Sequence, residues 1–148
     1  MGTLSKSSRC SEYRLHRRVQ FYEVDPARIV HFSRYFHYME EAEHALWREA
    51  GLSIAPPDRA ESFLRVSASF DYHQPLRFED EFEAWIRIAA ITEKSIRYTC
   101  LVTRGDTRIA TGSLVVVCAR AEPGQPMRAT AIPAEVAARF EVAEDLPA

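Results

Sequence analysis

The stretch FSRYFHYMEEAEHALWREA, residues 32–50, carries the clearest helical period in the chain. Its apolar positions recur every three or four residues and form one stripe, made of Tyr35, Tyr38, Met39, Ala42, Ala45, Leu46 and Ala50. Ser33 stands where a helix N-cap is expected, and Gly51 stands where a left-handed C-terminal residue belongs. We therefore predict one long amphipathic helix that buries a single face.

Four segments with strand-like alternation follow a loop at 51–61. Their apolar positions are Leu64, Val66, Ala68, Phe70 and Tyr72 in the first, Phe82, Ala84, Ile86, Ile88 and Ala90 in the second, and Ile96, Tyr98, Cys100 and Val102 in the third. The fourth runs over 107–120, after a tight hairpin at Gly105-Asp106. Residues 13–21 are extended in character, 122–133 form a loop, and 133–141 a short helix that begins with proline.

This order predicts an α+β fold in which a five-stranded antiparallel sheet curls around the long helix. A sheet with one apolar face needs cover, and only the helix at 32–50 is long enough to provide it. A long strand at 107–120 would leave unpaired edges in a monomer, so we expect at least a dimer. We predict one domain over 13–141, with a flexible N-terminal tail at 1–12 and a C-terminal tail at 142–148.

Composition limits the classes of partner. The chain has 148 residues, 47% of them hydrophobic and 27% charged, with a net charge of −2, so no basic field exists to attract nucleic acid. No apolar run approaches the ~20 residues that a membrane span requires. The three cysteines have neither the number nor the spacing of a disulfide framework or a zinc site. We therefore expect a cytoplasmic protein with no metal, nucleic-acid or membrane partner.

The segment FYEVDPARIVHFSRY, residues 21–35, is the richest in possible chemistry. It places Asp25 in a loop shortly before the start of the helix. A helix start offers unpaired N–H groups that suit an oxyanion, and a nearby carboxylate can attack a carbonyl or deprotonate a water molecule. Spacing alone is a weak signal, because an aspartate before a helix is more often a cap or turn residue.

The same segment resembles the signature of the 4-hydroxybenzoyl-CoA thioesterases and related acyl-CoA thioesterases. In that signature a valine, an aspartate, a glycine, an aromatic residue and a tyrosine stand at the positions of Val19, Asp25, Arg28, His31 and Tyr35. Arg28 and His31 depart from it. The similarity continues weakly through Lys94-Ser95 and residues 132–135, and covers roughly residues 14–141.

The resemblance implies a hot-dog fold and hydrolysis of an aromatic or medium-chain acyl-CoA. By it, Asp25 acts as nucleophile or general base, and the backbone N–H near Phe32 polarises the thioester carbonyl. His31 and Tyr35 line the acyl group, while Lys94 and Ser95 contact coenzyme A. The family places its active site at a subunit interface, so we expect a homodimer or homotetramer. No cofactor is implied, since coenzyme A is part of the substrate.

Alternatives remain open at this stage. The Val30-His31-Phe32 stretch faintly resembles the catalytic histidine of hydroxyacyl-thioester dehydratases, which share the fold, and Arg28 and His31 also leave room for a non-catalytic acyl-CoA-binding module. We interpret Glu23 as a solvated charge, with support of Asp25 as the alternative. We expect ordinary turn backbone at Arg28 with its guanidinium in solvent; the alternative is a contact to an acidic group of the ligand.

Overall fold

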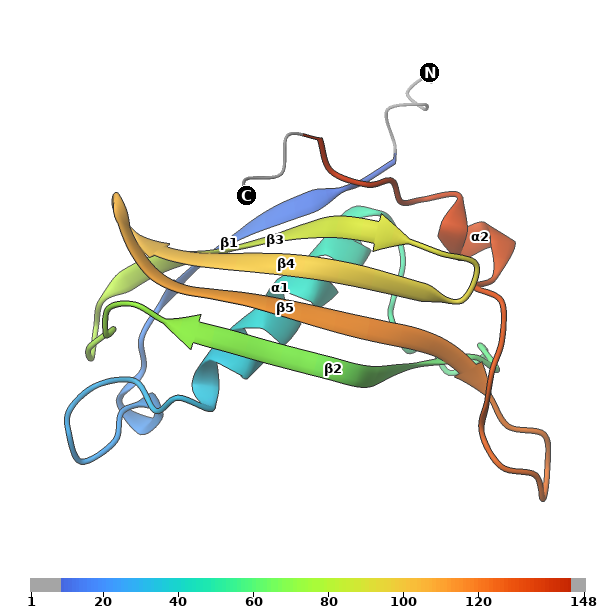
Figure 1. The fold of residues 1–148 in the computed structure, drawn as a ribbon, viewed down its shortest axis with the longest axis horizontal. Coiled ribbons are helices and arrows are strands. Elements are labelled where there is room, and N and C mark those ends of the chain that lie inside the picture. Colours follow the sequence, from blue (N-terminus) through green and yellow to red (C-terminus); the bar gives the residue numbers. More distant parts are fainter. Residues whose placement is uncertain (1–8, 145–148) are drawn as a thin grey trace.

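The computed structural model describes residues 9–144, which form a sheet and one long helix (Figure 1). The elements in chain order are β1 (Glu12–Arg18), a 3-10 turn η2 (Phe21–Glu23), α1 (Arg34–Glu49), β2 (Ser62–Tyr72), β3 (Glu81–Ile91), β4 (Ser95–Arg104), β5 (Thr107–Arg120), β6 (Arg128–Ala129) and α2 (Ala134–Ala137). The predicted α+β class, with one long helix against a five-stranded antiparallel sheet, is confirmed.

The strands are ordered β1-β3-β4-β5-β2, and the two-residue β6 adds a short pairing to β5 inside the predicted loop. α1 lies across one face of this sheet (Figure 1). β5 is therefore internal, paired on one side with β4 and on the other with β2. The sequence argument that the segment 107–120 leaves an exposed edge is wrong. The long edge belongs to β2 instead.

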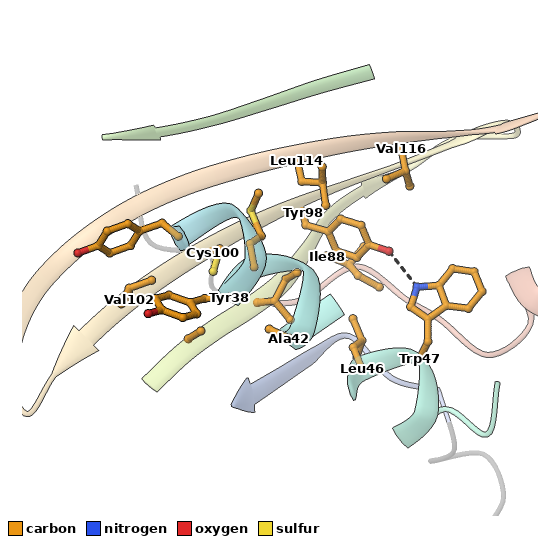
Figure 2. Close-up of a cluster of buried hydrophobic side chains, with 14 of the residues drawn as sticks. Tyr38, Ala42, Leu46, Trp47, Ile88, Tyr98, Cys100, Val102, Leu114 and Val116 are labelled. Carbon is orange, nitrogen blue, oxygen red and sulfur yellow. Dashed lines mark hydrogen bonds between the residues drawn. The ribbon is translucent and has the colours of Figure 1, made fainter. Parts of the chain in front are cut away.

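The apolar stripe of α1 forms the core, as predicted, and packs on the inward side chains of β3, β4 and β5 (Figure 2). Two further helix residues are buried that the period did not assign to this stripe. Trp47 donates its indole N–H to the Tyr98 hydroxyl at 3.0 Å. Glu43 is fully buried and pairs with Arg65 of β2, which compensates for the loss of water around both charges. Burial nevertheless raises the pKa of the Glu43 carboxyl, with Arg65 acting in the opposite direction.

β2 departs from simple alternation. Its register against β5 shifts between Arg65 and Ser67. Odd-numbered and even-numbered side chains therefore exchange faces of the sheet at this bulge. Arg65 consequently points toward the helix, where it reaches Glu43, although the alternation placed it outward. Leu64 and Val66, predicted to be inward, are 38% and 58% exposed. Phe70, beyond the bulge, does pack against the helix, at 5.2 Å from the Phe36 ring.

The remaining elements occur in the predicted order, some with shorter bounds. The β4–β5 hairpin turns at Gly105 with φ +59°, a conformation that glycine adopts without strain. α2 is shorter than the predicted 133–141, and its proline is the N-cap. Near the termini, Cys10 N–H donates to the Arg139 carbonyl at 2.8 Å and Ala143 N–H to the Ile88 carbonyl at 2.9 Å. Residues 1–8 and 145–148 of the predicted tails lie outside the described residues.

Candidate active site

Asp25 stands at the start of a small closed loop that links η2 to the helix. An isolated bridge pairs Val24 with Val30, and Asp25 N–H donates to the Ile29 carbonyl at 2.9 Å. The next residue is a proline, which favours a tight turn. Ala27 N–H donates to Asp25 Oδ1 at 2.8 Å, while Oδ2 accepts no hydrogen bond within residues 9–144. The loop thus fixes the carboxylate by one oxygen and leaves the other available.

Arg28 closes the turn in a strained conformation. Its N–H donates to the Asp25 carbonyl at 2.8 Å, and its φ is +69°. The expectation of ordinary backbone here is wrong, because the residue that follows this turn must enter the left-handed region before the chain rejoins Ile29. Glycine adopts that region without cost, whereas a residue with a Cβ pays about 1–2 kcal/mol. The side chain itself is exposed, as expected.

Glu23 is a buried structural carboxylate, so its interpretation as a solvated charge is wrong. It is 2% exposed and forms an ion pair with Arg17 at 2.9 Å. Its Oε1 also accepts hydrogen bonds from the Tyr38 hydroxyl and the Gln20 N–H, both at 2.9 Å. Its main-chain carbonyl accepts the His31 N–H at 2.9 Å. These contacts join both ends of the Asp25 loop to β1 and α1.

The chain between this loop and α1 leaves one backbone donor unused. Arg34 N–H donates to the His31 carbonyl at 2.9 Å, and Ser33 N–H to His31 Nδ1 at 3.2 Å. Ser33 occupies the N-cap position, but its hydroxyl contacts His31 Nδ1 at 2.8 Å and caps nothing. The Phe32 N–H has no hydrogen-bond partner among the described residues. It is therefore available to an external acceptor.

A pocket of about 360 Å³ opens beside Asp25 and Phe32. It is lined by Asp25, Ile29, Val30, Phe32, Tyr35, Tyr72, His73, Gln74 and Pro75. Burial raises the pKa of Tyr35 to about 12, so this hydroxyl stays neutral in the pocket wall at ordinary pH. The segment 72–75, which comprises the last residue of β2 and the loop after it, was not identified from the sequence as part of the site. Tyr72 carried only the signal of a core strand residue, and the loop residues carried none.

A second hollow, of about 500 Å³, also adjoins Asp25. It is lined by Tyr22, Val24, Asp25, Pro26, His31, Ser33, Arg34 and His37. The rings of His31 and Phe32 are tilted by 31° with centroids 4.6 Å apart, yet each residue lines a different hollow. Asp25 is the residue that lines both. The structure thus brings three other predicted site residues close to Asp25: Phe32 and Tyr35 in the first pocket, and His31 in the second hollow.

Lys94 and Ser95 lie elsewhere. Lys94 ends the turn between β3 and β4 and Ser95 begins β4, at the opposite end of the sheet from the Asp25 loop (Figure 1). There Ser95 Oγ contacts Thr92 Oγ1 at 2.6 Å, and the Lys94 carbonyl accepts the Cys118 N–H at 2.7 Å. A single chain does not place them at the site. Within residues 9–144, no three His, Cys, Asp or Glu side chains gather as a metal ion would require, and no helix there is long and apolar enough to cross a membrane.

The chain belongs to the thioesterase-like superfamily, whose family model matches residues 19–140. A relative from Aquifex aeolicus strain VF5, named "Putative esterase", is 33% identical over 95 residues, covering 64% of this chain and 74% of that protein. The solved structure of a gentisyl-coenzyme A thioesterase is 28% identical with a TM-score of 0.72, covering 84% of this chain and 98% of that one.

A mutant 4-hydroxybenzoyl-CoA thioesterase, solved with 4-hydroxybenzoyl-CoA, has a TM-score of 0.74 at 21% identity, covering 86% of this chain and 96% of that one. Likeness at that level of identity concerns the fold, which is the hot-dog fold. The family resemblance read from the sequence is thus confirmed.

Proposed function

We propose that this chain is an acyl-CoA thioesterase that uses Asp25 as nucleophile or general base. One observation carries the proposal. The Asp25 carboxylate is oriented through Oδ1 by the Ala27 N–H at 2.8 Å, its Oδ2 accepts no hydrogen bond within residues 9–144, and it lines an apolar pocket. A carboxylate so placed can attack a thioester carbonyl or take a proton from water beside it.

Phe32, whose N–H has no hydrogen-bond partner among residues 9–144, lines the same pocket, and we assign the complementary function to this N–H. As the carbonyl carbon becomes tetrahedral, negative charge develops on its oxygen, and a preoriented N–H stabilises that charge. Attack by Asp25 expels the CoA thiolate and leaves a mixed anhydride, which water hydrolyses to the free acid. In the alternative route, Asp25 deprotonates a water molecule that attacks directly. Both routes require the same carboxylate and the same donor.

The pocket favours an aromatic acyl group, with a medium aliphatic chain as the second choice. Its walls include the rings of Phe32, Tyr35 and Tyr72, and its volume of about 360 Å³ suits one small ring with its linkage. Aromatic faces offer favourable edge and offset contacts to a second ring. The gentisyl-coenzyme A thioesterase at 28% identity supports the same substrate class.

A dimer would complete the substrate site. β2 is a long edge strand whose backbone can pair with another chain, and its Leu64 and Val66 side chains are 38% and 58% exposed. We propose that a second copy pairs there. Lys94 and Ser95 lie at the far end of the sheet from Asp25, so their proposed contact with coenzyme A is made to a substrate held by another subunit.

The experiment is a free-thiol assay on purified protein with benzoyl-, gentisyl-, 4-hydroxybenzoyl- and octanoyl-CoA. We expect CoA release, fastest with the aromatic substrates. Crotonyl-CoA and 3-hydroxybutyryl-CoA serve as the dehydratase arm, followed by enoyl absorbance. Binding without thiol release on every substrate would identify an acyl-CoA-binding module and refute the proposal. Light scattering on the same sample should give at least twice the 16.9 kDa of one chain.

A further inference from the structure

Tyr72, the last residue of β2, makes a contact that core packing does not require. Its hydroxyl donates to the Phe32 carbonyl at 2.9 Å. Within residues 9–144 this is the one hydrogen bond made by the backbone of Phe32, since the Phe32 N–H has none. The residues on either side are held by the loop itself, His31 through Glu23 and Ser33 through His31. The Phe32 carbonyl therefore receives its one hydrogen bond within residues 9–144 from a side chain of another element.

The Tyr72 ring is well placed to hold the Phe32 carbonyl. It stands edge-on to Tyr35 with centroids 5.1 Å apart, and Tyr35 is almost completely buried on α1. On the other side it stacks with Phe70 at 6.2 Å, and its backbone pairs with Ala110 of β5. The hydroxyl thus extends from a strand and a packed aromatic group to the carbonyl of the Phe32–Ser33 peptide, whose N–H donates to His31 Nδ1 at 3.2 Å.

We infer that Tyr72 is a positioning residue for thioester hydrolysis: it holds the Phe32 carbonyl, and this restrains the backbone that joins the carbonyl, through the Phe32 Cα, to the Phe32 N–H. This inference rests on the proposed function, because it assigns Phe32 N–H as the donor to the developing oxyanion. Such a donor acts only when it lies within about 2.7–3.1 Å of the oxygen as charge develops, so a small rotation of the peptide weakens it. Binding of the acyl-CoA depends on the whole pocket and is less sensitive to that rotation. Loss of the Tyr72 hydroxyl should therefore lower kcat and leave KM unchanged.

The test compares the parent chain with Tyr72→Phe, which keeps the ring and removes the hydroxyl. We expect kcat to fall about tenfold, equivalent to about 1.4 kcal/mol of barrier, with KM changed by less than about twofold. The pH at which activity falls on the acid side should stay the same, because Asp25 is untouched. Tyr13→Phe is the matched control: Tyr13 lies on β1, lines neither hollow and should leave both constants unchanged. A kcat equal to that of the parent overturns the inference.

A second measurement separates this inference from the proposed function. Phenacyl-CoA, a thioether ketone, retains a carbonyl but cannot be hydrolysed. In ¹⁵N-labelled protein we expect it to shift the Phe32 amide resonance, and Tyr72→Phe should at least halve that shift while Tyr13→Phe preserves it. A parent that shows this pattern but releases no thiol refutes the proposed hydrolysis and leaves the role of Tyr72 standing. A Phe32 amide that does not respond, or responds equally in Tyr72→Phe, overturns the role of Tyr72 whether or not the parent hydrolyses thioesters.

Discussion

Replacing Glu23 by glutamine tests whether the buried carboxylate secures the Asp25 loop. Glu23 forms an ion pair with Arg17 at 2.9 Å, and their side chains are 3% and 18% exposed. Loss of one member of a buried pair costs about 3–5 kcal/mol. We expect the lower end, about 3 kcal/mol, because Arg17 keeps a second partner. The amide would also place a donor against the guanidinium, which has only donors, and disturb the bonds to Tyr38 and Gln20.

The matched control uses the same arginine. Glu41 contacts Arg17 at 2.7 Å, but its side chain is 44% exposed. Exposed pairs contribute about 0–1 kcal/mol, so Glu41→Gln should cost less than about 1 kcal/mol. Together the two carboxylates raise the pKa of Arg17, although burial alone would lower it. Arginine stays protonated at ordinary pH, so both variants contain a charged Arg17.

Denaturant melts of the parent and both variants give the comparison directly. In a thermal melt, a loss of about 3 kcal/mol in the free energy of unfolding corresponds to a fall in Tm of about 6–12 °C for a chain of this size. The reasoning is refuted if both variants lose the same stability, or if Glu23→Gln loses less than about 1 kcal/mol. Either result would mean that Glu23 is not the structural anchor of the loop.

Three further predictions each rest on a single structural feature. Arg28→Gly should raise the free energy of unfolding by about 0.5–1 kcal/mol, because relief of the φ +69° strain outweighs the extra entropy of the unfolded chain. Its kcat and KM should not change, and a KM rise of about tenfold would make Arg28 a substrate contact. Gly112→Ala should cost about 1–3 kcal/mol in a denaturant melt, since the new Cβ would stand 2.7 Å from the Phe70 ring and from the Ser69 carbonyl; unchanged stability would contradict that clash. Burial raises the pKa of Cys100 to about 12, so at about pH 8 roughly one thiol in ten thousand is ionised, and mass spectrometry should find it unlabelled by a thiol reagent until the protein unfolds.

The sequence predicted those elements in which one physical signal dominates. The helical stripe from Tyr35 to Ala50 and the alternation of Ile96, Tyr98, Cys100 and Val102 both report burial on one face, and every one of these side chains is buried. The same signal misled the prediction for β2. A one-residue bulge after Arg65 reverses the facing of the residues before it, and no composition or period marks where a bulge occurs.

The site residues divide in the same way, into those with a local signal in the sequence and those whose role depends on contacts with other elements. Asp25 and Phe32 could be proposed as site residues chiefly because their segment resembles the thioesterase signature, with weaker support from a carboxylate that stands just before a helix start. Glu23 could not be recognised as buried, because its burial depends on Arg17 and Tyr38, which approach from other elements. Tyr72 could not be assigned to the site, because only the strand order brings the end of β2 beside the start of α1. Strand order likewise decided which strand forms the edge.

The central claim, that the Asp25 carboxylate performs thioester hydrolysis, is tested most directly by kcat for Asp25→Asn on the best acyl-CoA substrate. Asparagine retains Oδ1, so the hydrogen bond from the Ala27 N–H and the loop should persist, and the melting temperature and oligomeric mass should match those of the parent. Loss of the ionised oxygen should lower kcat by about 10² to 10⁴. A kcat for Asp25→Asn comparable to that of the parent would contradict the account.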